Sequence, residues 1–139
     1  YILVRAYTEW GNDQIRRQRT ADAILCYRAA IETDPSDDVP RFKLAGVLAT
    51  CPEQRLRDPA EAVRQAELGL RLASYIVPSQ LVVLADAYAA ANRYADAAAV
   101  VQRALRLPEA IDNPELAGEL QQRWDRYRKL GWNAPKGVP

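Results

Sequence analysis

The chain has 139 residues, of which 49% are hydrophobic and 27% charged, so it is long and apolar enough for one domain with a buried core. Its 19 basic and 18 acidic side chains leave a net charge of +1, which argues against nucleic acid or an anionic membrane as the main partner. There is no His, and two Cys cannot complete a four-ligand zinc site, so we expect no metal site and no His-based catalysis. No apolar run reaches the roughly 18 residues of a membrane span, which predicts no membrane insertion.

The composition predicts an all-helical protein. Ala is frequent, Gly is rare, and most of the nine Pro stand between stretches whose apolar residues recur with helical spacing. Asp58-Pro59 and Asn113-Pro114 each place a capping side chain before a Pro at the first helical position, which favours a helix start. Gly131 is expected to end the last helix, leaving residues 132–139 as a tail. The predicted helices cover residues 3–17, 20–33, 37–50, 59–74, 78–91, 94–107 and 114–130.

Small and bulky residues repeat along the chain at fixed distances. Positions 74 residues apart correspond, so that Gly11, Ala23, Tyr27 and Ala30 match Ala85, Ala97, Val101 and Ala104. A unit lies between them, in which Leu44 and Ala45 follow Trp10 and Gly11 by 34 residues, and Ala62, Ala66 and Gly69 follow Ala23, Tyr27 and Ala30 by 39. The five extra residues fall within 51–59, where two Pro predict a loop.

This pattern resembles the tetratricopeptide-repeat family, whose units of 34 residues are helix–turn–helix pairs with small residues where helices cross. The resemblance covers residues 4 to about 108. It implies three repeats at about 4–35, 38–74 and 78–109, the middle one extended by a loop. It also implies an all-α, right-handed superhelical solenoid over residues 1–131, closed by a capping helix at about 114–130. Trp10, Tyr27 and Tyr88 are among the bulky residues expected to fill the spaces between helices.

In this family the first helices of successive pairs line a concave surface that receives a partner. The resemblance therefore implies a non-catalytic interaction or scaffold module for a peptide or protein partner. The surface is expected to be mostly small and apolar, with an anchor near Phe42. The alternative is a plain superhelix surface without a ligand. The residues predicted to line it are Arg5, Thr8, Asn12, Phe42, Gly46, Val82 and Asp86.

One branch of the family binds the C-terminal carboxylate of chaperones through a clamp of Lys, Asn and Arg. Asn12 stands where that branch has its first Asn, but Thr8 stands where it has a Lys. Ser79 and Val82 supply no later basic residue. The sequence therefore predicts that this clamp is absent.

A second hypothesis is structural. The sequence shows no capping helix before the first repeat, so this edge is expected to be bare or to be covered by something outside this chain. An open solenoid edge favours end-to-end assembly of copies into an oligomer or filament. The apolar residues 1–4 and Trp132 in the tail are the segments expected to take part. An enzyme is not expected, because there is neither a His nor a convergent polar cluster. No cofactor is implied, since the six Gly are scattered singly rather than gathered in a phosphate loop.

The two cysteines are predicted to lie on neighbouring helices. Cys26 is expected early in the second helix of the first pair, and Cys51 at the end of the helix that follows. Antiparallel packing of those helices would allow a disulfide between Cys26 and Cys51. The alternative is two buried, small apolar side chains.

The compartment is left open by the sequence. The chain begins on Tyr1 rather than Met, which predicts a processed or trimmed piece of a longer product, either cytoplasmic or exported. Sixteen Arg against three Lys suggest a GC-rich bacterial gene.

Overall fold

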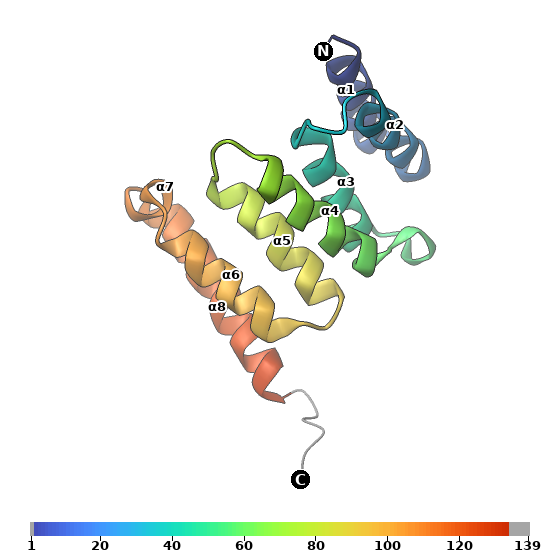
Figure 1. Cartoon of the computed structure of the whole chain (residues 1–139). Helices are drawn as coiled ribbons and strands as arrows, with labels where there is room; N and C mark the ends of the chain where they lie inside the picture. The colour runs from blue at the N-terminus through green and yellow to red at the C-terminus, as the bar shows by residue number, and fades with distance from the viewer. Residues whose placement is uncertain (1, 134–139) are drawn as a thin grey trace.

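A computed structural model describes residues 2–133 and confirms the all-α prediction (Figure 1). The side chain of Trp132 and residues 134–139, which include most of the predicted tail, lie outside the described residues. Within residues 2–133, no helix is long and apolar enough to cross a membrane. The elements are α1 (Ile2–Arg16), α2 (Thr20–Thr33), α3 (Val39–Thr50), the 3-10 turn η1 (Gln54–Leu56), α4 (Pro59–Leu72), α5 (Pro78–Ala90), α6 (Tyr94–Leu105), α7 (Pro108–Ile111) and α8 (Pro114–Asn133).

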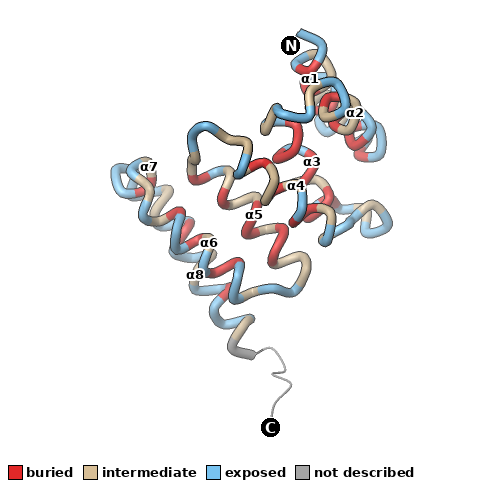
Figure 2. Tube along the Cα trace, viewed as in Figure 1, coloured by how far each residue is buried: buried red, intermediate tan, exposed pale blue. Residues whose placement is uncertain are grey.

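The helices form a solenoid of antiparallel pairs, as the repeat pattern predicts. The pairs are α1 with α2, α3 with α4, and α5 with α6, and α8 packs along α6 after the single turn α7 (Figure 1). The pairs stack because α2 packs on α3 and because both α3 and α4 pack on α5. Figure 2 shows the buried residues on the faces that the helices turn toward one another.

A glycine meets an aromatic ring within each of the first two pairs. In the first pair the ring of Tyr27 on α2 lies over Gly11 on α1, so that a Cβ at Gly11 would stand 2.4 Å from Tyr27 Cε1. In the second pair the ring belongs to the first helix, and a Cβ at Gly69 would stand 2.9 Å from Phe42 Cζ. Missing side chains at these two positions therefore let the helix axes approach closely.

Trp10 does not fill a space between helices, contrary to the sequence prediction. Its side chain is 58% exposed, although its repeat equivalents Leu44 and Leu84 are 0% and 5% exposed. Leu44 and Leu84 lie on helices that are covered by α2 and α4 of the preceding pairs. No described helix precedes α1, so Trp10 rests only edge-on against Tyr7, with ring centroids 5.7 Å apart.

Several helix ends differ from the prediction by a few residues. The cap at Asp58 is confirmed, since its Oδ1 accepts a hydrogen bond from Glu61 N at 3.1 Å, but α3 begins at Val39, two residues later than expected. The turn α7 was not predicted. α8 continues past Gly131 to Asn133, because no described glycine has a positive φ and Gly131 instead packs beside Tyr94 of α6. Gly131 is therefore a contact position and not a helix stop.

Of the two alternatives for the cysteines, the disulfide between Cys26 and Cys51 is not formed, since both cysteines are free. On α2, Ile24 and Tyr27 belong to the buried core. Cys26 lies about 200° around the helix axis from Ile24 and is only half-buried. The Cys51 thiol is turned into its own loop, where it donates to the Glu53 carbonyl at 3.4 Å.

Replacing Gly11 with Ala is expected to destabilise the fold by about 1–3 kcal/mol, because the new methyl group overlaps the Tyr27 ring. The matched control is Gly118→Ala on α8, where a Cβ meets no atom within 4 Å. That change should stabilise the helix by about 0.5–1 kcal/mol. Urea unfolding followed by circular dichroism measures both. Equal effects of the two substitutions would contradict the packing described for Tyr27.

Candidate functional site

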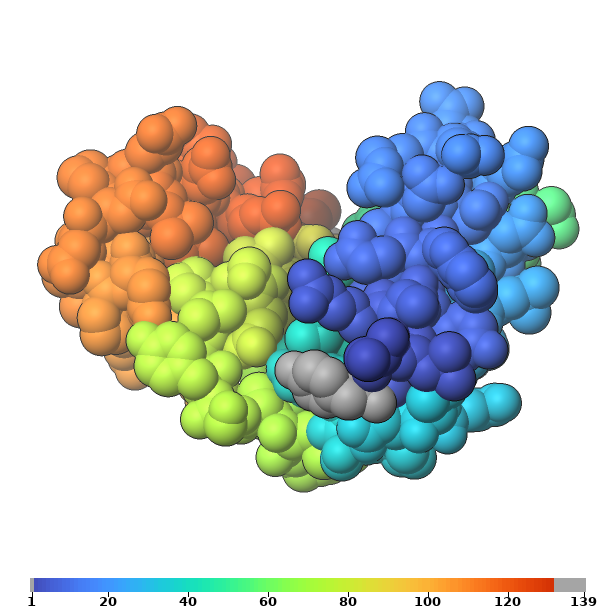
Figure 3. All heavy atoms as spheres, turned by 90° about the horizontal axis from the view of Figure 1, so that it is seen from above, coloured from blue at the N-terminus to red at the C-terminus, as the bar shows by residue number. Residues whose placement is uncertain are grey.

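A groove with a volume of 490 Å³ lies where the first two repeats meet the third. Figure 3 shows that the surface is hollowed between the N-terminal and C-terminal helices. We name this groove the concave groove. Its walls come mainly from the first helices of the three pairs and consist of Asn12, Ile15, Arg16, Tyr27, Phe42, Lys43, Gly46, Val47 and Val83.

The polar groups of the concave groove are hydrogen-bond donors. Burial raises the pKa of Tyr27 to about 12, so its hydroxyl is protonated at neutral pH and donates to Asn12 Oδ1 at 2.8 Å. The Asn12 oxygen is thereby occupied, and its amide N–H groups remain for a ligand. Arg16 and Lys43 add two cations at the rim, and no acidic side chain lines this groove. The arrangement therefore favours a ligand that carries acceptor oxygens.

Arg16 is partly neutralised, whereas Lys43 is not. Arg16 lies 3.4 Å from Asp13, and Arg17 lies 2.9 Å from the same carboxylate. Lys43 is exposed on α3 and, within the part of the chain that the structure describes, takes part in no ion pair. Lys43 therefore contributes the stronger uncompensated charge at this rim.

The structure brings three of the seven predicted residues into the concave groove, namely Asn12, Phe42 and Gly46. Phe42 is not an exposed anchor, because its side chain is only 8% exposed and its ring rests on Gly69. Gly46 leaves open space, since a Cβ there would meet no atom within 4 Å.

Four predicted residues lie elsewhere. Thr8 is buried and donates to the Val4 carbonyl at 2.8 Å, which removes it from any ligand surface. Arg5 is exposed on α1 and is not among the groove residues. Val82 faces α8 in a separate hollow of 380 Å³ that it shares with Arg123. Asp86 accepts from Arg123 at 2.6 Å and from the Tyr127 hydroxyl at 3.1 Å, so α8 occupies this end of the predicted surface.

Sequence reasoning missed Lys43, Val47 and Val83. Each of them follows a predicted concave position by one residue, after Phe42, Gly46 and Val82 respectively. Successive residues on a helix differ by about 100° in direction, and a groove between helices is wider than one residue per turn. The sequence could have revealed these residues if the position after each predicted concave residue had also been considered.

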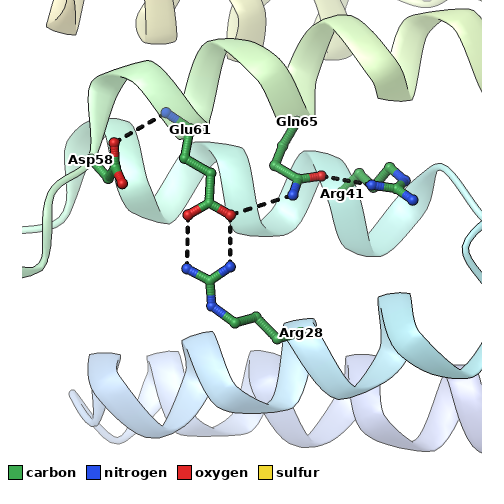
Figure 4. Close-up of polar contacts among 5 residues, drawn as sticks. All are labelled: Arg28, Arg41, Asp58, Glu61 and Gln65. Atoms are coloured by element: carbon green, nitrogen blue, oxygen red, sulfur yellow. Dashed lines mark hydrogen bonds and ion pairs between the residues drawn. The ribbon is translucent and has the colours of Figure 1, made fainter.

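A polar network joins the first repeat to the second behind the groove (Figure 4). Arg28 of α2 donates two hydrogen bonds to the Glu61 carboxylate of α4, at 2.6 and 2.8 Å. Gln65 accepts from Arg41 at 2.9 Å, and Arg41 donates to the Pro35 carbonyl at 2.7 Å. The network therefore ties α2, the chain between the repeats and α4 together.

The ion pair between Arg28 and Glu61 shifts the pKa values of both side chains. The hydrogen bonds from Arg28 lower the pKa of the Glu61 carboxyl below its usual value. The same hydrogen bonds raise the pKa of the Arg28 guanidinium. Folding is therefore coupled to ionisation of Glu61.

Comparison with known proteins agrees with this arrangement at the level of the fold. No protein-family model matches the sequence, and no curated protein matches it. Among solved structures, the first tetratricopeptide-repeat domain of Spaghetti (RPAP3), determined with the HSP90 peptide SRMEEVD, superposes with a TM-score of 0.70 at 23% identity over 91% of this chain and 96% of that one. The chain has the tetratricopeptide-repeat fold.

Two further tetratricopeptide-repeat structures give the same result. The first such domain of human RPAP3 has a TM-score of 0.66 at 22% identity and covers 91% of this chain and 96% of its own. The N-terminal domain of stress-induced protein-1 from C. elegans has a TM-score of 0.63 at 22% identity, over 86% and 93% of the two chains. These likenesses establish the fold of this chain.

Replacing Glu61 with Gln is expected to lower the free energy of unfolding by about 1 kcal/mol at pH 7, since it removes a charged partner from a half-exposed Arg28. The depressed pKa means that the ionised carboxylate is favoured in the folded state. Its stabilisation is present above about pH 4.3 and is lost as the pH falls through the lower, folded-state value. Denaturant titrations at several pH values should show the two proteins converging below about pH 4.

The control for this comparison is Glu32→Gln, at an exposed position on α2. Within residues 2–133, Glu32 is in no ion pair, and its replacement should leave the stability nearly unchanged at every pH. A gap between wild type and Glu61→Gln that stays constant down to about pH 2 would show that the carboxylate charge does not contribute.

Proposed function

We propose that the chain is a non-catalytic module that binds an extended peptide segment of a partner protein in the concave groove. The observation that carries this proposal is the set of donors at the groove, namely the Asn12 amide, Lys43 and the partly neutralised Arg16, beside apolar walls. Such a surface fits a peptide that presents a carboxylate or other acceptor oxygens together with apolar side chains. This narrows the expected partner to one with an acidic group at the groove.

The structural neighbours support the proposal by analogy. The RPAP3 domain was solved with a peptide that ends in Glu-Glu-Val-Asp, and it shares the fold of this chain. Of the clamp positions compared in the sequence, only Asn12 is retained at the groove, since the Thr8 that stands in place of the clamp Lys is buried. We therefore place the acidic group of the peptide at Lys43 and Arg16, on the first two repeats.

An enzymatic function has no comparable support. In the described part of the chain, no group of three or more metal-binding side chains lies together. The strongest polar clusters, around Glu61 and Asp86, are closed ion pairs that hold helices together. The contacts of Glu61 and Asp86 are therefore explained by a structural role.

End-to-end assembly stays a prediction with weaker support. The uncovered α1 face at Leu3 and Trp10 would have to meet the outer face of α8 from another copy. That face of α8 carries exposed charged residues, among them Glu115, Glu119 and Lys129. Burying unpaired charges against apolar residues is unfavourable, so we favour the groove.

Peptides selected from a displayed random library on the wild-type chain should bind less well to the variant Arg16→Glu/Lys43→Glu. We expect a loss of at least about tenfold in affinity, because charged hydrogen bonds contribute roughly 1.5–3 kcal/mol each and the new carboxylates repel an acidic peptide. Fluorescence anisotropy of a labelled peptide measures the change. Affinity should also fall as salt is raised.

Arg103→Glu is the matched charge reversal at an exposed position on α6, away from the groove, and should leave the affinity unchanged. Circular dichroism confirms that each variant folds. Library selection that yields no binder, or binders that tolerate the double reversal, would overturn the proposed function.

A further inference from the structure

A second cavity, with a volume of 570 Å³, lies beside the concave groove between the first and second repeats. It shares Ile15, Gly46 and Val47 with the groove, so the two spaces are adjacent. Gln18 and Thr20 complete the wall on the first repeat, and the loop after α3 completes the opposite wall. We name it the repeat-junction cavity.

The cavity exists because the first repeat is set apart from the second on this side. α3 packs along α5, whereas α1 makes no comparable contact with α3 within the described residues. The first repeat is joined to the second mainly through α2, by its packing on α3 and by the Arg28–Glu61 pair. The space between α1 and α3 therefore stays open, whereas α2 packs directly on α3.

The loop wall of the cavity is preformed. Asp58 N donates to the Leu48 carbonyl at 3.0 Å, which closes the loop back onto α3. Arg57 Nε donates to the Cys51 carbonyl at 2.6 Å, and Leu56 packs against the core. This loop is the extension that lengthens the middle repeat, so the cavity wall is built from residues that the other two repeats lack.

The polar groups of the α3 and loop walls are already bonded within the chain. The Thr50 hydroxyl donates to the Gly46 carbonyl at 2.8 Å, and the Cys51 thiol donates to the Glu53 carbonyl. The Glu53 carboxylate accepts from Arg55 at 3.0 Å. The surface left for a ligand is consequently mainly apolar, formed by Ile15, Val47 and Pro52 with the open space above Gly46. Gln18 and Thr20 are the polar side chains on the wall of the first repeat.

We infer that the repeat-junction cavity binds one bulky apolar side chain of the same peptide whose acidic group lies at Lys43 and Arg16. This inference rests on the proposed function and adds which side chain of the peptide the site selects. Three observations combine here: the cavity adjoins the groove through three shared residues, Arg16 and Lys43 line the groove and not the cavity, and the cavity walls are mainly apolar with room for a bulky side chain. The recognised segment thus pairs an acidic residue with a neighbouring Leu, Phe or Trp.

The direct test fills the cavity with a larger side chain from its own wall. Gly46→Leu adds a side chain where a Cβ would have no atom within 4 Å, so the fold is retained. A library-selected peptide should bind this variant at least about tenfold more weakly, which corresponds to burial of one apolar side chain. The matched control is Gly118→Leu, at a helical glycine with equally open space on α8 and outside both cavities. It should bind like the wild type.

A double-mutant cycle separates this inference from the proposed function. Replacing the bulky apolar residue of the peptide by Ala should weaken binding to the wild type about tenfold and have little further effect on Gly46→Leu. Equal effects of the peptide change on both proteins, with binding still sensitive to Arg16→Glu/Lys43→Glu, would overturn the cavity assignment and leave the groove intact.

The cavity has one competing occupant, a free apolar small molecule. The dye 1-anilinonaphthalene-8-sulfonate serves as its probe. Dye binding that is lost in Gly46→Leu while the selected peptide binds unchanged would assign the cavity to small molecules and overturn the peptide side chain. Dye displaced by the peptide from the wild type supports the inference.

Discussion

The close approach of two helices at a glycine is the constraint on which this solenoid depends. Gly11 admits the ring of Tyr27, and Gly69 admits the ring of Phe42. The first contact also orients a polar group of the groove, because it directs the Tyr27 hydroxyl toward the Asn12 amide oxygen, to which it donates a hydrogen bond. The second contact holds Phe42 down on α4, which leaves the groove above it to Lys43 and Gly46. Core packing and ligand surface are thus set by the same residues.

Each helix pair is completed by its neighbour, which explains how burial is distributed along the chain. Leu44 and Leu84 are buried because a preceding helix covers them, and Leu120 on α8 is buried against α6 by the same rule. Trp10 lacks such a cover in the described chain and remains exposed. Arg123 of α8 holds Asp86, so the last helix both covers the core and ends the usable concave surface. The open part of that surface therefore lies over the first two repeats.

Sequence reasoning recovered the fold because the small positions recur with the repeat, and small residues have few other reasons to recur. It recovered less of the site. Phe42 was expected to be an anchor because its helix faces the concave side. Its ring instead packs on α4, in the space that the missing side chain of Gly69 leaves. Cys26 was paired with Cys51 from helix adjacency, although the rotation of α2 about its axis turns that side chain elsewhere. The turn α7 was missed because Pro108 and Pro114 bracket too few residues for a periodic pattern.

The attachment of the first repeat to the second mainly through α2 has a consequence for how such a chain would respond to a partner. Stability in a stacked array is a sum over neighbouring units, so a terminal pair held on one side has the smallest free energy of local opening. A peptide that contacts both α1 and α3 would add a second connection between the first and second repeats, on the open side between these two helices. Part of its binding free energy would go into restraining the first repeat, and amide hydrogen exchange in α1 and α2 would slow when the site is filled. The module would then report occupancy through the rigidity of its N-terminal end.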